Sequence, residues 1–232
     1  MELERKVILA LAVLLMGTIT AYAIAPAGVT WIRDTSYSLG AAGASSSDVT
    51  EGGNITVLNI TGVNQSTERW AGYLGNVSSV GSLIVLANDA SPIDIFYNWT
   101  WDSAQGGEVC AGTGTSYTWA SLEAAAATDL DSTWGFGDVS DDAEATFDDG
   151  TGTFEIGGVS STAPKADTGF EDGYETFLLE DTPGASAETD FLFCSNISAA
   201  GTGYDGSTVD YELIVPTSYG ATETYYFYLE VN

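Results

Sequence analysis

The stretches TVDYELIV at residues 208–215 and YYFYLEV at residues 225–231 decide the fold class of this chain. In the first, apolar or aromatic side chains occupy every second position from Val209 to Val215, and the second stretch alternates in the same way. Successive side chains of a strand point to opposite faces of a sheet, so this period of two predicts two β-strands. The intervening residues 216–220 predict a turn, which would make the pair a C-terminal β-hairpin.

A third alternating stretch, IDIFYNWTW, occupies residues 93–101. Its odd-numbered residues, from Ile93 to Trp101, are expected on the core face, and Asp94, Asn98 and Thr100 on the opposite, hydrated face. Further strands are predicted at residues 29–38, 54–63, 81–87, 151–156, 174–179 and 189–195. Residues 45–53 and 157–168 are predicted to be flexible loops.

One helical segment is expected within this series of strands. Ser121 can cap a helix, and the alanine-rich residues 122–127 have high helix propensity. The helix would end near Leu130, before Gly135. The predicted fold class is therefore all-β, an antiparallel β-sandwich of jelly-roll or Ig-like type with one short helical insertion.

The N-terminus has the three parts of a secretory signal peptide. Arg5 and Lys6 precede ten apolar residues at 7–16, and residues 21–23 form an A-x-A cleavage site. The alternative is a retained membrane anchor over residues 7–27. We expect residues 1–23 to be the signal peptide, 24–47 an N-terminal arm, and 48–232 a single β-sandwich domain.

The asparagines of the chain predict glycosylation. N-x-[ST] triplets begin at Asn54, Asn59, Asn64, Asn76, Asn98 and Asn196. Chance would give roughly one or two such triplets, and N-linked glycans occupy exposed positions of exported proteins. The chain is therefore predicted to be a secreted or cell-surface glycoprotein.

The two cysteines of the chain, Cys110 and Cys194, agree with export. An even cysteine count in a secreted protein predicts a disulfide, and buried free thiols are the alternative. Closing the intervening loop would remove roughly 4–5 kcal/mol of unfolded-state entropy in the chain-entropy model.

The charge of the chain excludes several classes of partner. Without Glu2, Glu4, Arg5 and Lys6, 31 of the 33 carboxylates remain against three bases, so the net charge stays at −28. Nucleic acid and anionic lipid surfaces both require clustered lysine and arginine, and both are excluded. High salt, bound divalent cations or low external pH would relieve the self-repulsion.

An acid-rich stretch at residues 138–155 contains candidate calcium ligands. The candidates are Asp138, Asp141, Asp142, Asp148 and Asp149. An EF-hand is excluded because Ala145 and Phe147 would occupy its first and third ligand positions. Irregular loop sites for Ca²⁺ and a solvated acidic loop without an ion both remain open.

The chain has no histidine, which removes Ser-His-Asp and Cys-His catalysis and histidine-containing zinc sites. We predict that the protein is not an enzyme, and a hydrolase that uses paired carboxylates is an alternative. The tryptophans could stack on sugars or fill a sheet core. The candidates are Trp70, Trp99, Trp101, Trp119 and Trp134.

The sequence resembles secreted archaeal cell-surface β proteins at residues 69–78 (RWAGYLGNVS), 95–101, 211–216 (YELIVP) and 225–228 (YYFY). The resemblance covers about a quarter of the chain. Some proteins of this kind polymerise into extracellular filaments in which each subunit lends a strand to its neighbour. The resemblance therefore implies partnership with copies of the same chain, and it assigns no functional residue.

The function predicted from these observations is that of a structural subunit of an extracellular, filament-like or pilus-like glycoprotein assembly. Residues 24–39 are the candidate donor strand, because they carry Val29, Trp31 and Ile32 and precede the Gly/Ser-rich residues 40–47. Pairing of this segment within its own subunit is the alternative. A monomeric adhesin or carbohydrate-binding module is the runner-up function, followed by a secreted hydrolase.

Overall fold

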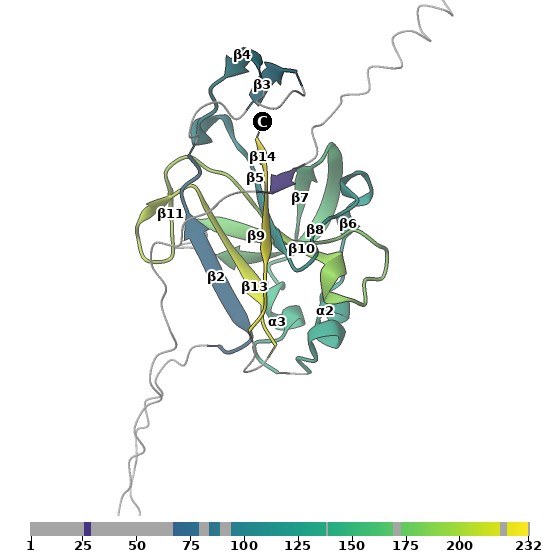
Figure 1. Cartoon of the computed structure of the whole chain (residues 1–232). Coiled ribbons are helices and arrows are strands. Elements are labelled where there is room, and N and C mark those ends of the chain that lie inside the picture. Colours follow the sequence, from purple (N-terminus) through teal and green to yellow (C-terminus); the bar gives the residue numbers. More distant parts are fainter. Residues whose placement is uncertain are drawn as a thin grey trace, which may run out of the picture.

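The computed structural model describes residues 26–28, 67–78, 84–88, 94–137, 139–168, 173–218 and 222–231. Strands dominate this part of the chain, and its α-helices, α2 (Ala127–Trp134) and α3 (Ala143–Thr146), are short (Figure 1). Every strand pairing in the described ranges is antiparallel, so the predicted all-β, antiparallel class is confirmed. The leader 1–23 and the predicted segments 29–38, 45–53 and 54–63 lie outside the described residues.

The main sheet has eight strands, in the order β1-β14-β5-β10-β9-β8-β7, with β6 pairing beside β8 on β9. Its strands are β1 (Ala27–Gly28), β5 (Gly107–Gly112), β6 (Glu123–Ala124), β7 (Thr151–Ile156), β8 (Val159–Thr168), β9 (Tyr174–Glu180), β10 (Phe191–Asn196) and β14 (Tyr226–Val231). The central strand β10 is buried from Phe191 to Ser195. Its nearly continuous apolar sequence is the pattern expected of a strand covered on both faces.

Two hydrophobic cores lie against the main sheet. Odd and even residues of β10 belong to different cores, because successive side chains of a strand point to opposite faces. The first core includes Leu130, Trp134, Phe191, Phe193, Leu213 and Val215. The second core includes Cys110, Phe154, Phe177, Leu192, Cys194 and Tyr228. Helix α2 and strand β13 cover the first core, and the β7–β8 hairpin covers the second.

The remaining strands form three two-stranded sheets: β13 (Tyr211–Pro216) with β2 (Trp70–Gly75), β11 (Gly201–Thr202) with β12 (Thr208–Val209), and β3 (Ile84–Ala87) with β4 (Ile95–Trp99). The predicted C-terminal hairpin is wrong, because β13 pairs with β2 whereas β14 pairs with β5 and β1. Alternation identified both strands correctly. Alternation does not indicate which strand pairs with which, and β13 and β14 belong to different sheets.

The predicted loop at residues 157–168 is also wrong, because Val159 to Thr168 form β8. The local glycines account for the tight turn between β7 and β8: Gly157 and Gly158 have φ angles of 60° and 76°. Two successive positive φ values suit a two-residue hairpin turn. The two glycines therefore mark only the turn itself, and the small residues that follow them belong to β8.

The predicted helix exists but begins later than expected. Glu123 and Ala124 form β6, which pairs with β9, and α2 starts at Ala127. Pairing with a core strand overrides the helix propensity of the alanines. The helix also ends later than the expected end near Leu130: its last residue is Trp134, and the left-handed φ of 66° at Gly135 closes the last turn.

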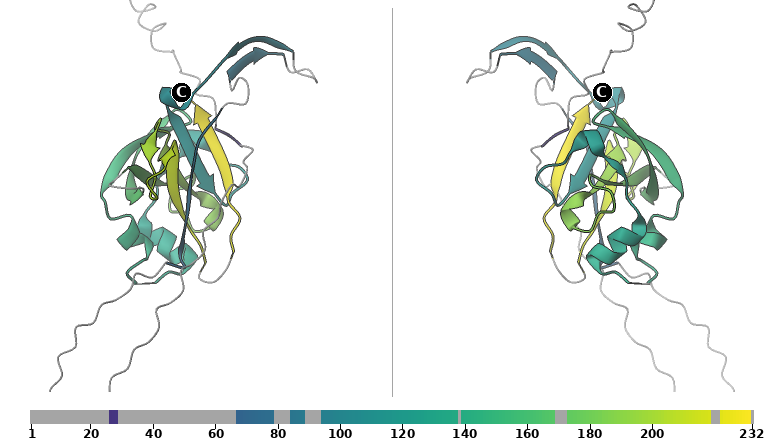
Figure 2. Two further views of the ribbon diagram at one scale, coloured as in Figure 1. Left: turned by 90° about the vertical axis from the view of Figure 1, so that its left-hand side faces the viewer. Right: turned by 90° about the vertical axis from the view of Figure 1, so that its right-hand side faces the viewer.

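The stretch at residues 93–101 does not fill a core along its length. Figure 2 shows β3 and β4 as a curved ribbon that projects from one end of the body. Among the core-face residues whose side chains the structure describes, Ile95 and Tyr97 are exposed and Trp101, at the base, is buried. An alternating aromatic strand fits a buried sheet face, but β4 pairs with β3 alone among the described strands.

Candidate functional site

The disulfide between Cys110 and Cys194 is present, as predicted. The two residues lie directly opposite each other on the neighbouring strands β5 and β10, and both are fully buried in the second core. The disulfide therefore links the neighbouring strands β5 and β10 covalently in the middle of the main sheet.

The edge of the main sheet at β14 is the first candidate site. On its outer side, β14 pairs with β1 through Ala27 opposite Leu229 and Gly28 opposite Tyr228. β14 has six residues, so four of them have no described strand partner on that side. Residues 27–28 thus pair within their own subunit, at one edge of the sheet that the described residues form.

The side chains of β14 suit an edge that accepts a further strand. Tyr228 is buried in the second core, and Phe227, Leu229 and Val231 pack only partly buried against the first core. Tyr226 is exposed. A longer neighbouring strand would lie beside apolar side chains on both faces and bond to the backbone along the length of β14.

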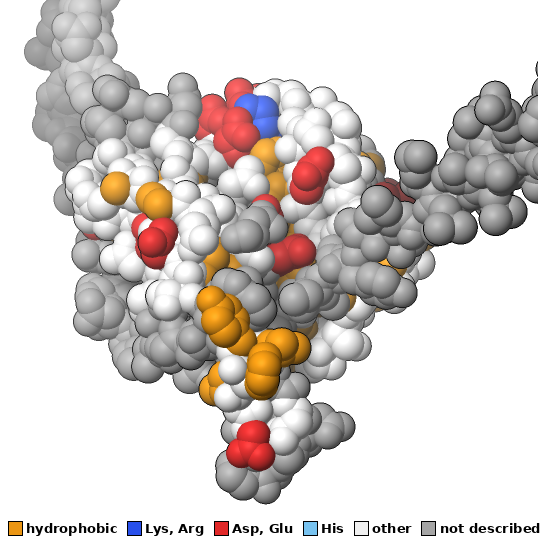
Figure 3. Space-filling view, turned by 90° about the horizontal axis from the view of Figure 1, so that it is seen from above, with side chains coloured by type: hydrophobic (Ala, Val, Ile, Leu, Met, Phe, Trp, Pro, Cys, Tyr) orange, Lys and Arg blue, Asp and Glu red, His pale blue; other side chains and the backbone are white. Residues whose placement is uncertain are grey.

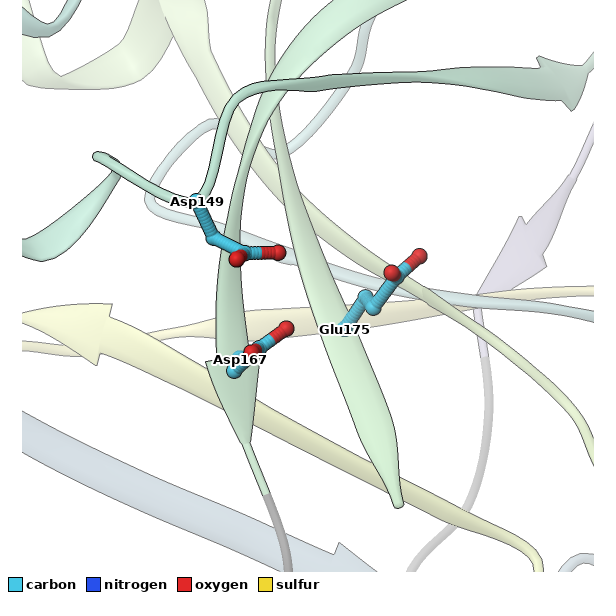
Figure 4. A group of neighbouring side chains, drawn as sticks. All are labelled: Asp149, Asp167 and Glu175. Carbon is cyan, nitrogen blue, oxygen red and sulfur yellow. The ribbon is translucent and has the colours of Figure 1, made fainter. Parts of the chain in front are cut away.

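A cluster of carboxylates is the second candidate site, and Figure 4 shows its three side chains. Asp149, Asp167 and Glu175 place carboxylate oxygens within 4.8 Å of one another. Asp167 and Glu175 are cross-strand partners on β8 and β9, and Asp149 precedes β7. Carboxylate oxygens are the ligands that Ca²⁺ prefers, so within the described part of the chain these three residues are the set that could hold it.

A lysine already supplies positive charge to this cluster. The Lys165 ammonium lies 2.6 Å from an Asp149 carboxylate oxygen and also contacts Glu175. Hydrogen bonds to Asp149 and Glu175 raise the pKa of Lys165, and the hydrogen bond from Lys165 lowers the pKa of Asp149. The cluster is therefore a surface ion-pair network in which the ammonium stands where a metal ion would.

Of the five predicted calcium ligands, Asp149 alone belongs to this cluster. Asp141 pairs with Arg69 at 2.7 Å, and the hydrogen bond from Thr67 together with the Arg69 charge lowers the pKa of Asp141. Asp142 caps α3 by accepting from the Ala145 amide. Asp148 is exposed, and Asp138 lies outside the described residues. Sequence spacing missed Asp167 and Glu175, because strand register brings them together.

Three other carboxyl groups have raised pKa values, which no sequence pattern indicated. Burial raises the pKa of Asp131 and Glu230, although Glu230 accepts a hydrogen bond from the Gly157 amide. Burial and the nearby Glu223 charge raise the pKa of Glu188. The folded state therefore binds protons at these positions more readily than the unfolded chain does.

Mild acidification is expected to stabilise the fold. Because the pKa values of Asp131, Glu188 and Glu230 are higher in the folded state than in the unfolded chain, protonation of these groups increasingly favours the folded state as pH falls from 7 toward about 5. The smaller net charge at lower pH also favours the folded state. Below roughly pH 4, Asp141 and Asp149 lose their ion pairs and stability falls again. Melting temperatures at constant ionic strength should therefore peak between pH 4 and 6, to within about a unit.

The Glu230→Gln variant is the control for this pH profile. Glutamine can still accept the hydrogen bond from the Gly157 amide but does not titrate. The rise in melting temperature between pH 7 and 5 should be smaller in this variant than in the wild type. A wild-type melting temperature that declines steadily from pH 7 to 5 would contradict the expectation.

The predicted glycosylation sites are only partly within the described residues. Asn76 follows β2 and Asn196 ends β10, and both side chains are exposed, as a glycan requires. Asn98 lies in β4, but its side chain is outside the described part. Asn54, Asn59 and Asn64 are outside it altogether.

The tryptophans proposed for sugar stacking pack mainly inside the molecule. Trp101 and Trp134 are buried in the first core. Trp70 packs edge-on against Phe136 and Phe147, and Trp119 packs edge-on against Tyr228. The side chain of Trp99 lies outside the described residues.

No protein-family model matches the chain, and no curated protein and no solved structure matches it either. Within the described ranges, no helix has the length and apolar character that crossing a membrane requires. The function must therefore be inferred from the β14 edge, the disulfide and the exposed surface.

Proposed function

We propose that this protein is a structural subunit of an extracellular or cell-surface glycoprotein assembly, filament-like or pilus-like, held together by β-strand addition between copies. The N-terminal segment of one copy would pair with β14 of the next. The observation that carries the proposal is the antiparallel pairing of the N-terminal residues Ala27 and Gly28 with Leu229 and Tyr228 of β14, at one side of the main sheet.

The pairing within the subunit shows the geometry that exchange between subunits would use. A strand that leaves its own sheet and joins the same edge of a neighbour makes the same backbone hydrogen bonds, so exchange changes the free energy little. In the register of Ala27 opposite Leu229, a donor's Val29 would lie opposite Phe227. The donated segment would thereby extend the pairing along β14 and cover more of its apolar side chains.

The compartment and the surface support the same function. A buried disulfide is typical of proteins that fold in an oxidising environment. Exposed Asn76 and Asn196 can carry glycans without disturbing the sheet. The resemblance to secreted archaeal cell-surface proteins agrees with such an assembly, and the acidic surface would remain hydrated in high salt.

A pair of engineered cysteines tests the strand exchange. Ala27 and Leu229 lie opposite each other, so the Ala27→Cys/Leu229→Cys variant can form a disulfide only where this pairing exists. In assembled material, oxidation is expected to give a ladder of covalent multimers on a non-reducing gel. In the chain without engineered cysteines, deletion of residues 24–39 should abolish the assembly itself.

The matched control pairs Ala27→Cys with Thr222→Cys, because Thr222 is exposed and lies outside the β1–β14 register. This control should give no ladder. A double-cysteine protein that closes only within single chains, together with a 24–39 deletion that leaves the size distribution unchanged, would refute strand exchange as the basis of assembly.

A further inference from the structure

Three apolar side chains form a row along the acceptor edge of the main sheet. Leu229, Phe227 and Tyr225 are alternate residues in and just before β14, and all three pack partly buried against the first core. The Phe227 ring meets the Tyr73 ring of β2 edge-on, with centroids 4.9 Å apart. The Tyr225 hydroxyl donates to the Pro216 carbonyl at 2.6 Å. The row is therefore held in place by β2 and by the end of β13.

The row ends at a carboxylate. Glu223 is the next alternate residue before Tyr225, and its side chain accepts hydrogen bonds from the Ser218 amide at 3.0 Å and the Ser218 hydroxyl at 2.6 Å. Glu188, in the short 3₁₀ helix η3 (Glu188–Asp190), lies near it, since burial and the Glu223 charge raise the pKa of Glu188. Two neighbouring, half-buried carboxyl groups favour the approach of a cation.

The N-terminal segment contains a series that matches this row. The pairing of β1 places Ala27 opposite Leu229, and each further residue moves one position back along the β14 segment. Opposed residues of an antiparallel pair point to the same face of the sheet. Continued in the same register, the opposed pairs on the first-core face are Val29 with Phe227, Trp31 with Tyr225, and Arg33 with Glu223.

The charged pair distinguishes this register from its alternatives. A slip by one residue would turn Val29 and Trp31 to the opposite face of the sheet. A slip by two residues would keep the apolar side chains on the correct face, but it would move Arg33 two positions away from Glu223. The apolar pattern alone therefore permits several registers, and the register seen at Ala27 is the one that also opposes the two charges.

Bases are scarce enough in this protein for the position of each one to matter. Beyond residue 23 the chain has three, which are Arg33, Arg69 and Lys165. Figure 3 shows acidic side chains spread over one face of the molecule and basic surface confined to one place on it. Arg69 and Lys165 both form ion pairs inside the subunit. Arg33 is the base that the register brings to the acceptor edge.

We propose that the Arg33 guanidinium of one copy pairs with the Glu223 carboxylate of the next and thereby sets the register of the donated strand. The inference rests on the proposed function, because it names the charged contact through which the donor segment recognises β14. A guanidinium has five N–H donors, so Arg33 can bond to Glu223 and also lie against Glu188. The Trp31 ring packs beside Tyr225 in the same contact.

A charge swap between copies tests this contact. One variant is Arg33→Glu and the other is Glu223→Arg, and each alone opposes like charges where strands are exchanged. The protein concentration needed for half-maximal assembly, measured by sedimentation velocity, should rise about tenfold or more for either variant alone. An equal mixture of the two should assemble like the wild type, because the donor of each variant then meets a complementary acceptor on the other.

Glu155→Arg is the matched control. Glu155 is an exposed carboxylate on β7, which lies at the other end of the strand order from β14, and its replacement changes the net charge as Glu223→Arg does. This control should assemble at the wild-type concentration. Glu223→Arg also removes the acceptor of the Ser218 hydrogen bonds, so recovery in the mixture will show that this variant still folds.

The outcomes separate the charged contact from strand exchange itself. Assembly of either variant alone at the wild-type concentration overturns the Arg33–Glu223 pair, whereas strand exchange is judged by the Ala27→Cys/Leu229→Cys ladder. A mixture that fails, while the double variant with both changes in one chain recovers, shows that the pair closes within a subunit and refutes exchange between copies. Recovery in neither the mixture nor the double variant also overturns the charged pair.

Discussion

Replacing both Cys110 and Cys194 with alanine is expected to lower the free energy of unfolding by about 4 kcal/mol. The bond closes a loop with a sequence separation of 84, so its loss returns a large amount of conformational entropy to the unfolded chain. Both side chains are fully buried in the second core, and alanine avoids introducing a polar group there. Urea unfolding followed by tryptophan fluorescence measures the change.

The unmutated protein under a strong reductant is the control for the disulfide prediction. Its unfolding midpoint should move in the same direction as that of the double alanine variant, because both lack the covalent loop. A double variant whose free energy of unfolding lies within about 0.5 kcal/mol of the wild type would show that the bond contributes little.

The second large effect is expected for Phe193→Ala, which should lower the free energy of unfolding by about 3–5 kcal/mol. Phe193 is fully buried on β10 and packs edge-on against Trp134 and Tyr225, with ring centroids 6.2 and 6.3 Å away. Truncation would leave a cavity in the first core between the main sheet and α2. The measurement is equilibrium denaturation with the disulfide intact.

Phe96→Ala is the matched comparison, because it removes the same kind of side chain from an exposed position in β4. Its effect on the isolated subunit should stay within about 0.5 kcal/mol, as for other surface substitutions. Equal losses at the two positions would contradict the assignment of Phe193 to the core and Phe96 to the surface.

The sequence predicted the strands well wherever apolar and polar residues alternate. The expected strand at residues 151–156 coincides with β7, and the expected strand at 174–179 differs from β9 by one residue. β8 was missed because it consists mainly of small and polar residues after two glycines. Its strand conformation comes from pairing with β7 and β9, which a local reading does not contain.

Pairing and burial were the properties that the sequence could not supply. Residues 93–101 have the alternation of a core strand. Ile95 and Tyr97 are nevertheless exposed, because β4 belongs to the two-stranded sheet that it forms with β3. The carboxylate cluster was missed in the same way, because Asp167 and Glu175 become neighbours only through the register of β8 and β9. The N-terminal segment was predicted to be a strand, with donation to a neighbour or pairing within its own subunit as the alternatives, but its pairing with β14 through residues 27–28 was not predicted.

The position of the disulfide has a mechanical consequence for any assembly joined at β14. Tension applied through a donated strand would shear β14 and pass next into β5, its neighbour in the sheet. From β5 to β10 the force would travel through a covalent S–S bond as well as through backbone hydrogen bonds. Under tension, a subunit should therefore lose the pairing between β14 and β5 first, while the disulfide keeps β5 and β10 covalently linked.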